Sequence, residues 1–337
     1  MSALSAMGPE GDIVLTSRVR LARNLAGRPF VNRATLEQDN EVLEQVRAAL
    51  EGWQEPMSCV PMSGLEKAKR QSLVERHLIS QELTGIESGA LILNPEETVA
   101  IMVNEEDHLR IQSLQPGYQL RAAFEAANAV DDALEASLDF AFDEEWGYLT
   151  CCPTNVGTGM RASAMMHLPA LALTRQIGTV LSTLGKIGLT IRGIYGEGTD
   201  ALGCVFQVSN QVTLGVSEED ILRRVSTAVE SIVRNERFAR NYLREQRGAD
   251  LEDKLWRSYA LLTHARKLSG QEFMNFWSDA IMGASMGILP VEVGKLLQAL
   301  EQCQAATLTV RAGQEMEAAQ RDHYRAERVR ELLYKEA

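Results

Sequence analysis

Four short segments of the chain combine arginine with residues that favour turns. They are "TSRVR" (16–20), "NEEDHLR" (104–110), "CCPTNVGTGMR" (151–161) and "RGIYGEG" (192–198). Arginine presents several N–H donors in a planar fork that matches phosphate oxygens. Because the chain as a whole has a net charge of −12, this selective placement of positive charge predicts a cage for a triphosphate. Taken singly, each arginine is also compatible with an ordinary solvated surface charge.

Two of these segments also carry a carboxylate, Glu106 and Glu197. Carboxylates repel ATP, so they indicate a second ligand, and a planar guanidinium with two N–H edges would satisfy both. A guanidinium has a pKa above about 12 and no free lone pair. It must therefore lose a proton to a nearby base as its nitrogen attacks phosphorus. A thiolate at Cys152 would add negative charge beside that nitrogen.

Taken alone, the segment from Cys151 to Arg161 allows several interpretations. A zinc site is disfavoured because the five cysteines show no C-x-x-C spacing. A P-loop would need a lysine that is absent here, although residues 157–161 could offer backbone N–H groups and a helix N-terminus to an anion. Cys152 is a candidate reactive thiol. The alternative is that both cysteines are small buried residues of a strand.

The overall composition is that of a globular protein. With 337 residues, 45% of them hydrophobic, the chain can bury a full core and form two domains. Its acidity argues against direct nucleic-acid binding. The odd number of cysteines and the lack of a signal-peptide pattern predict a cytoplasmic location. The most apolar window, 163–178, contains His167, Pro169 and Arg175, so no membrane span is expected.

The elements that would position these segments form a mixed domain over residues 1–250 and a smaller helical domain over 251–337. The predicted strands lie at 13–21, within 90–115, at 146–152 and within 189–215. The predicted helices are 36–51, 64–82, 118–140, 217–247, 251–267, 270–285, 290–300 and 304–335, with a further one beginning at "SAMMHLPALAL" (163–173). Alternation near residue 110 puts Leu109 and Ile111 on one strand face and His108 and Arg110 on the other.

The ordered set of motifs resembles the ATP:guanido phosphotransferases, the family of creatine kinases, arginine kinases and their bacterial relatives. "SRVR", "NEEDHLR", "CPTNVGT" and "RGIYGEG" follow the family order over about residues 12–250, and the last two are most similar to the bacterial protein arginine kinases. The resemblance implies an α+β fold: an antiparallel sheet flanked by helices, followed by a smaller all-helical C-terminal domain. It also implies transfer of the γ-phosphoryl group of ATP to arginine side chains of proteins, with Mg²⁺ bound mainly through the nucleotide.

The resemblance assigns a role to each motif residue. Glu106 and Glu197 would hold the guanidinium, with Glu197 as the base, and Cys152 would orient it without forming a covalent intermediate. Cys151 is expected to be structural, and no residue is assigned to a metal. His77 is either a nucleotide contact or an ordinary helix-surface histidine. The nucleotide-binding set is Thr16, Ser17, Arg18, Val19, Arg20, His77, Arg110, Arg161, Ala162, Ser163, Ala164, Met165, Arg192, Gly193, Ile194, Tyr195 and Gly196.

Near the C-terminus, "RDHYRA" (321–326) resembles a motif of the protein arginine kinases that binds phosphoarginine allosterically. On a helix, Arg321 and Arg325 lie one turn apart and could clamp one phosphate, and the resemblance places Asp322 in the same site. The alternative is a solvated helix in which Asp322 and Arg325 form a local ion pair.

The resemblance also implies partners: protein substrates with exposed arginines, a small zinc-binding activator, an AAA+ unfoldase and protease that receives the marked proteins, and a stress-response repressor. The apolar helical C-terminus favours a homodimer. Metabolic members of the family carry a helical domain before the "SRVR" motif. In this chain the motif begins within the first 20 residues. This difference predicts a more open cleft, suited to an arginine on a polypeptide. Two alternatives stay open: a kinase of free arginine or another small guanidine, and a non-catalytic phosphoarginine-binding regulator.

Overall fold

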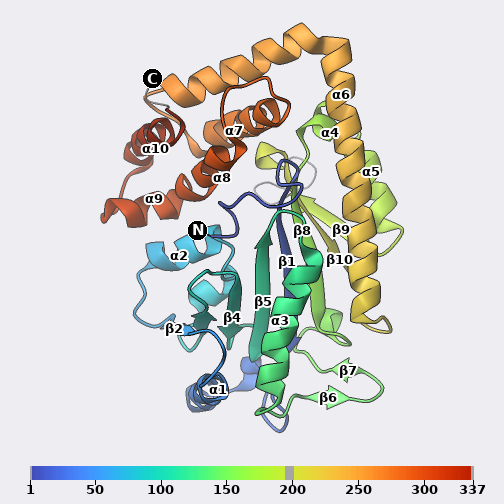
Figure 1. Cartoon of the computed structure of the whole chain (residues 1–337). Helices are drawn as coiled ribbons and strands as arrows, with labels where there is room; N and C mark the ends of the chain where they lie inside the picture. The colour runs from blue at the N-terminus through green and yellow to red at the C-terminus, as the bar shows by residue number, and fades with distance from the viewer. Residues whose placement is uncertain (1, 194–200, 335–337) are drawn as a thin grey trace.

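A single eight-stranded antiparallel sheet organises the chain (Figure 1). The computed structural model describes residues 2–193 and 201–334. The strand order is β2-β3-β4-β5-β1-β8-β10-β9, so β1 and β8 lie near the centre. The strands are β1 Val14–Arg23, β2 Ser58–Pro61, β3 Ala90–Leu93, β4 Val99–Val103, β5 Leu109–Pro116, β8 Met160–His167, β9 Leu189–Gly193 and β10 Val205–Asn210. A separate hairpin pairs β6 Phe142–Asp143 with β7 Gly147–Tyr148.

Helices flank this sheet and form the C-terminal part of the chain, as the resemblance implied. They are α1 Leu36–Ala49, α2 Lys67–Glu75, α3 Leu120–Glu135, α4 Pro169–Leu173, α5 Ile177–Gly185, α6 Glu218–His264, α7 Gly270–Ser285, α8 Val293–Gln302, α9 Ala305–Ala312 and α10 Ala318–Leu333. In Figure 1, α7 to α10 gather beside one end of the sheet, and α6 runs along its other side before bending over them. In the part of the chain that is described, no helix combines the length and apolar character needed to cross a membrane.

Helix α3 covers one face of the central strands. Its buried residues Leu120, Ala123, Ala127, Val130 and Leu134 recur at intervals of three and four, which puts them on one stripe of the helix. This stripe packs against β1 and β5. Strand side chains alternate between faces. The residues of β1 that point away from α3 are therefore free to line a site on the opposite face of the sheet.

The prediction of a helix beginning at residue 163 is wrong, because Met160–His167 forms the central strand β8. This segment pairs with β1 on one side and with β10 on the other. A fully paired central strand is apolar on both faces and lacks clear alternation, so periodicity does not separate it from a buried helix. The helix begins only at Pro169, a residue suited to the first helical turn. Arg161 is consequently delivered by a strand.

Other boundaries also differ from expectation. The two helices predicted at 217–247 and 251–267 form one element, α6, distorted at Arg247 (φ −139°, ψ 31°). The helix predicted at 304–335 is divided in two at Gly313, whose φ of +67° ends α9. Helix α2 ends at Glu75, and His77 adopts a φ of +60°. In "WGYLTCC", only Gly147 and Tyr148 are in a strand.

The C-terminal helices contact the sheet domain through specific polar bonds. The Glu75 carboxylate accepts bonds of 2.8 Å from the backbone N–H groups of Ala306 and Thr307 at the start of α9. Buried His167 of β8 lies 2.8 Å from the hydroxyl of Ser278 in α7. These bonds fix α9 against α2 and α7 against the central strand.

Candidate active site

The face of the sheet opposite α3 collects the predicted arginines. Arg18 and Arg20 are alternate residues of β1 and therefore point to the same side. In the strand register, Arg161 lies opposite Arg20, and Arg110 lies opposite Ala22. Arg192 of β9 lies opposite Gln207, which accepts a bond of 3.0 Å from Arg18. Four strands thus bring together five arginines from segments far apart in the sequence.

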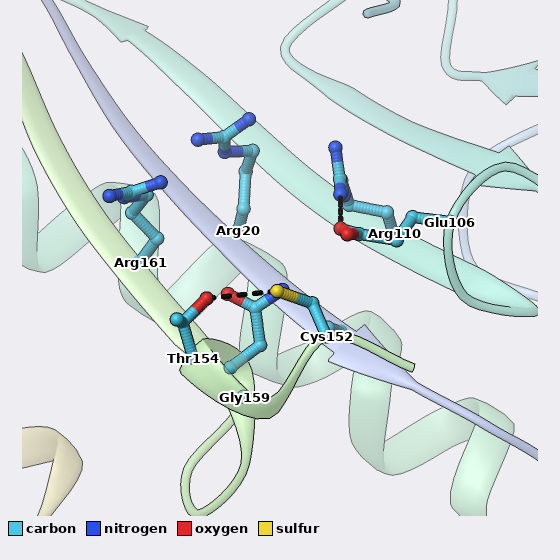
Figure 2. Close-up of a pocket in the computed structure, with 9 residues that line it drawn as sticks. Arg20, Glu106, Arg110, Cys152, Thr154, Gly159 and Arg161 are labelled. Atoms are coloured by element: carbon cyan, nitrogen blue, oxygen red, sulfur yellow. Dashed lines mark hydrogen bonds and ion pairs between the residues drawn. The ribbon is translucent and has the colours of Figure 1, made fainter. Parts of the chain in front are cut away.

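Three of these arginines line one cavity, which Figure 2 shows in close-up. The cavity encloses about 220 Å³. Arg20 and Arg161 project into it from neighbouring strands, and Cys152 and Glu106 stand on its other sides. Its lining is Arg20, Ala22, Glu106, Arg110, Cys152, Thr154, Asn155, Gly159 and Arg161. The structure therefore brings the phosphate-binding candidates next to two of the three catalytic candidates.

Two glycines allow the loop after Cys152 to form a wall of this cavity. Gly157 has a φ of +110°, and a Cβ atom there would lie 2.3 Å from the carbonyl oxygen of Thr213. Gly159 has a φ of +62°, and its Cβ would lie 2.6 Å from the carbonyl oxygen of Ala22. Both positions require positive φ and close backbone approach, which only glycine provides without strain.

A second, smaller cavity continues along the same face of β1. It is lined by Thr16, Arg18, His77, Leu114, Ser163, Met165 and Gln207. Because Thr16, Arg18, Arg20 and Ala22 are alternate residues of β1, the two cavities lie along one row of side chains. His77, which follows α2, thus reaches the sheet face and lies beside the arginines.

Burial and mutual repulsion make the arginine face electrostatically costly. Burial, followed by the charges of Arg110 and Arg161, lowers the pKa of Arg18 to about 10. Burial and then Arg18 lower the pKa of Arg20 well below its usual range. Burial, followed by Arg192 and Arg110, lowers the pKa of Arg161. Like charges held together out of water favour any ligand that supplies compensating negative charge.

Arg110 differs from its neighbours because carboxylates neutralise it. Its guanidinium lies 2.7 Å from Glu106 and 3.0 Å from Glu105, and Figure 2 shows the contact with Glu106. Over residues 2–193 and 201–334, the structure contains no salt bridge to Arg20 or Arg161. The unneutralised positive charge is therefore concentrated between β1 and β8.

A buried carboxylate holds Cys152 in place. The Oδ1 atom of Asp107 accepts bonds of 2.7 Å from the backbone N–H of Cys151 and from the side-chain amide of Asn24. Asp107 follows Glu106 directly, so one residue links the turn that bears Glu106 to the loop that bears Cys152. The thiol of Cys152 itself lies 3.0 Å from the hydroxyl of Thr154.

Sequence reasoning did not single out Asp107, Thr154 or Asn155. Asp107 lies inside the "NEEDHLR" motif, but a catalytic role was predicted only for its neighbour Glu106. Among three consecutive acidic residues, the one that is fully buried must find polar partners within the protein. No pattern in the sequence tells which of the three that is. Thr154 and Asn155 lie in the "PTN" turn that follows Cys152, so the motif contained them without indicating a role.

The structure divides the predicted nucleotide-binding set by strand face. Thr16, Ser163 and Met165 line the smaller cavity. Four other members of the set alternate with the cavity-lining residues along β1 and β8. Their side chains lie on the α3 face and are buried there: Ser17, Val19, Ala162 and Ala164. Their side chains therefore point away from the arginines, because a strand alternates its faces, and their assignment to the nucleotide site stays a prediction. Gly193 ends β9. Ile194, Tyr195, Gly196 and Glu197 lie outside the described residues.

The "RDHYRA" segment lies in α10, and its two arginines have different surroundings. Arg321 lines a cavity of about 310 Å³ bounded by α2, α9 and α10, and its buried Nε finds no partner in the described chain. Arg325 is buried and donates to the carbonyl oxygens of Cys303 (2.9 Å) and Leu268 (2.8 Å). It also lies 2.8 Å from Asp322. The local pair between Asp322 and Arg325 is thus present, and only Arg321 faces this cavity.

Comparison with known proteins agrees with this geometry. The family model of the ATP:guanido phosphotransferase C-terminal catalytic domain matches residues 40–239, and that of the protein-arginine kinase McsB C-terminal domain matches residues 248–337. A protein-arginine kinase of Moorella thermoacetica is 50% identical, with 98% of this chain and 96% of the relative covered. One from Brevibacillus brevis is 45% identical, with 97% and 93% covered.

Solved structures of guanidino kinases have a similar fold. Lombricine kinase is 26% identical, with a TM-score of 0.60 over 69% of this chain and 68% of that one. The duplicated taurocyamine kinase of Schistosoma mansoni with bound transition-state analogue components is 26% identical, with a TM-score of 0.63 over 75% of this chain and 38% of that one. The resemblance drawn from the motifs is confirmed. The chain belongs to the ATP:guanido phosphotransferase family, in its protein-arginine kinase branch.

Proposed function

We propose that this protein transfers the γ-phosphoryl group of ATP to arginine side chains of proteins. The observation that carries the proposal is the arrangement in one cavity: Arg20 and Arg161 provide unneutralised positive charge, and Glu106 and Cys152 provide acidic groups beside them. The first pair suits a polyphosphate, and the second suits a guanidinium. The near full-length similarity to proteins named protein-arginine kinase supports the same acceptor.

In this proposal the nucleotide phosphates bind along the row of arginines. Arg18, Arg20, Arg161 and Arg192 would donate to the phosphate oxygens in bidentate fashion. The phosphates would remove the repulsion that lowers the pKa values of Arg18, Arg20 and Arg161. Part of the binding free energy would therefore come from relief of electrostatic cost already present in the folded protein.

The acceptor guanidinium would be held by Glu106 and Glu197, with Cys152 beside the reacting nitrogen. As the N–P bond forms, the bond between the γ-phosphorus and the bridging oxygen breaks, and ADP leaves with those electrons. The guanidinium proton passes to a carboxylate, which we assign to Glu197. Phosphoryl transfer has a loose transition state, so alignment of the reactants and charge stabilisation would supply most of the acceleration.

We propose that Mg²⁺ reaches the site with the ATP phosphates, where it would neutralise charge that develops during transfer. Two carboxylates of the described chain that lie beside the arginines, Glu105 and Glu106, already form salt bridges with Arg110. This engagement favours a metal held mainly by phosphate oxygens and water.

The C-terminal cavity is a candidate site for phosphoarginine. Arg321 supplies its cationic group, whereas Arg325 and Asp322 would shape the helix around it, because Arg325 is engaged by carbonyl oxygens. We further propose a cytoplasmic homodimer that marks proteins for an AAA+ unfoldase and protease, assisted by a zinc-binding activator, and that acts on a stress-response repressor. These partners rest on the family resemblance.

Replacing Glu197 separates nucleotide binding from transfer. Glu197→Ala is expected to abolish phosphoryl transfer while the dissociation constant for ATP changes little, because the carboxylate serves the acceptor. Cys152→Ser is expected to slow transfer without abolishing it, since the thiol orients the guanidinium. Equal loss of ATP affinity in Glu197→Ala, or a trapped phosphocysteine in the wild-type protein, would contradict these roles.

A further inference from the structure

A hairpin at the edge of the active-site loop exposes two aromatic side chains. We call residues 142–148 the aromatic hairpin; it consists of β6, its turn and β7 and projects from the lower edge of the molecule in Figure 1. The side chains of Phe142 and Trp146 are 58% and 49% exposed. Two large, exposed aromatic side chains on one short hairpin are unfavourable in water, and such exposure commonly marks an interaction surface.

The aromatic hairpin is a built structure. The Oδ1 atom of Asp143 accepts bonds from the backbone N–H groups of Glu145 (2.8 Å) and Trp146 (2.9 Å), which fixes the turn. The ring of Phe142 packs edge-on against Tyr148, with 5.2 Å between ring centroids. The two exposed aromatic residues are therefore held on a folded scaffold and are not part of an unstructured tip.

The base of the aromatic hairpin is joined to the active-site cavity. Tyr148 and Gly157 exchange backbone hydrogen bonds of 2.8 and 3.3 Å. Gly157 lies in the loop between Asn155 and Gly159, which both line the cavity. The same Tyr148 ring stacks on the buried Arg23 guanidinium, 3.5 Å from the ring centroid. The aromatic hairpin thus borders the wall of the site into which a target arginine must enter.

The charge of the aromatic hairpin indicates the kind of partner. Glu144 and Glu145, at its tip, are exposed, and neither forms a salt bridge with a residue in 2–193 or 201–334. An aromatic face next to free carboxylates attracts lysine and arginine side chains through cation–π and ionic contacts. A small guanidine that fits inside the cavity would not extend to this surface, whereas a polypeptide would.

We propose that the aromatic hairpin is a docking surface for a basic, extended segment of the protein substrate next to the target arginine. Trp146 and Phe142 would contact the basic and apolar side chains of that segment, and Glu144 and Glu145 would pair with its charges. The proposal rests on the proposed function, because it requires an arginine presented on a polypeptide.

The test uses the full-length protein and two peptides that each contain one arginine. One peptide has lysines flanking the arginine, and the other has glutamines in their place. The hairpin variants are Trp146→Ala, Phe142→Ala and the pair Glu144→Gln with Glu145→Gln. The matched controls are Trp256→Ala, which removes a tryptophan of similar exposure (41%) from α6, and the pair Glu245→Gln with Glu252→Gln, which makes the same charge change.

For the lysine-flanked peptide, each hairpin variant is expected to raise KM about threefold, the size of one exposed cation–π or ionic contact. The KM for ATP should stay unchanged in all hairpin variants, the thermal midpoint should stay unchanged in the Trp146 and the paired glutamate variants, and the controls should show wild-type KM values. The paired glutamate change should not alter KM for the glutamine-flanked peptide.

An unchanged peptide KM in all hairpin variants, or an equal rise in the α6 controls, would overturn the docking proposal while leaving the kinase activity intact. Failure of the wild-type protein to phosphorylate either peptide would instead refute the proposed function, and the docking proposal with it. The two failures are therefore distinguishable in one experiment.

Discussion

Arg20 of β1 lies directly opposite Arg161 of β8, and neither guanidinium forms a salt bridge with a carboxylate of the described chain. Like charges at facing positions of a sheet destabilise it. The sequence therefore maintains an unfavourable pair at the centre of its main sheet. Such a cost is common at functional sites, where binding a ligand of opposite charge recovers it.

Removing one of these charges should stabilise the nucleotide-free protein. The lowered pKa of Arg20 shows that the folded state disfavours its charged form. Arg20→Gln is therefore expected to raise the free energy of unfolding by about 1 kcal/mol, and to raise KM for ATP at least about tenfold through loss of a charged phosphate contact. Thermal unfolding without ATP measures the first effect, and initial rates at varied ATP concentration measure the second. Arg33→Gln, at an exposed arginine, is the control, and a lower thermal midpoint for Arg20→Gln would contradict the prediction.

Asp107 should act on catalysis by positioning other groups. Asp107→Ala would leave the Cys151 N–H without its acceptor and remove one of the two acceptors of the Asn24 amide, which also donates to the carbonyl oxygen of Leu149. Each buried donor left unsatisfied costs about 1–3 kcal/mol. We expect a lower kcat with little change in KM for ATP, because Cys152 and Glu106 lose their common anchor. Asp107→Asn keeps one acceptor oxygen and should recover most of the rate. Equal damage by both variants would show that the charge of Asp107, and not its anchoring bonds, matters.

His77 should make the protein less stable in mild acid. Burial, followed by the charge of Arg18, lowers the pKa of His77 from 6.5 to about 4. Between these two values the unfolded chain binds the extra proton and the folded chain does not, so the free energy of unfolding falls as the pH falls and levels off below about pH 4. His77→Gln removes this contribution. The difference in unfolding free energy between wild type and variant should be constant above pH 6.5. Below pH 6.5, the wild type should lose stability relative to the variant. A difference that does not change with pH would contradict the shifted pKa.

The sequence predicted the charged residues of the site better than the elements that carry them. The arginines of β1, β5, β8 and β9 stand in motifs whose order is specific, so their convergence followed from the resemblance. The sequence pattern predicts a helix next to Arg161, because the residues of β8 are buried on both faces and show no period of two. Its identity as a strand depends on pairing with β1 and β10, which lie about 140 residues before and 40 residues after it in the chain.

Contiguous motifs also include residues whose side chains point away from the arginines. Ser17, Val19, Ala162 and Ala164 share segments with the arginines but point to α3, because the face of a strand residue depends on its phase. The anchoring role of Asp107 depends on contacts with Asn24 and Cys151, which lie far from it in sequence. The same is true of Glu75, whose partners are at the start of α9. Local patterns do not contain this information.

The most direct test of the account offers the purified protein Mg-ATP with an unfolded, arginine-containing protein in one reaction and with free arginine in another. The phosphate gained by each acceptor is then measured. A phosphate that is lost in acid and is not attached to a hydroxyl group identifies a phosphorus–nitrogen bond. A protein arginine kinase should transfer the phosphate to the protein substrate. Label on free arginine alone would assign the chain to small-guanidine metabolism and contradict the proposed function, and the absence of any ATP turnover would point to a non-catalytic phosphoarginine-binding protein.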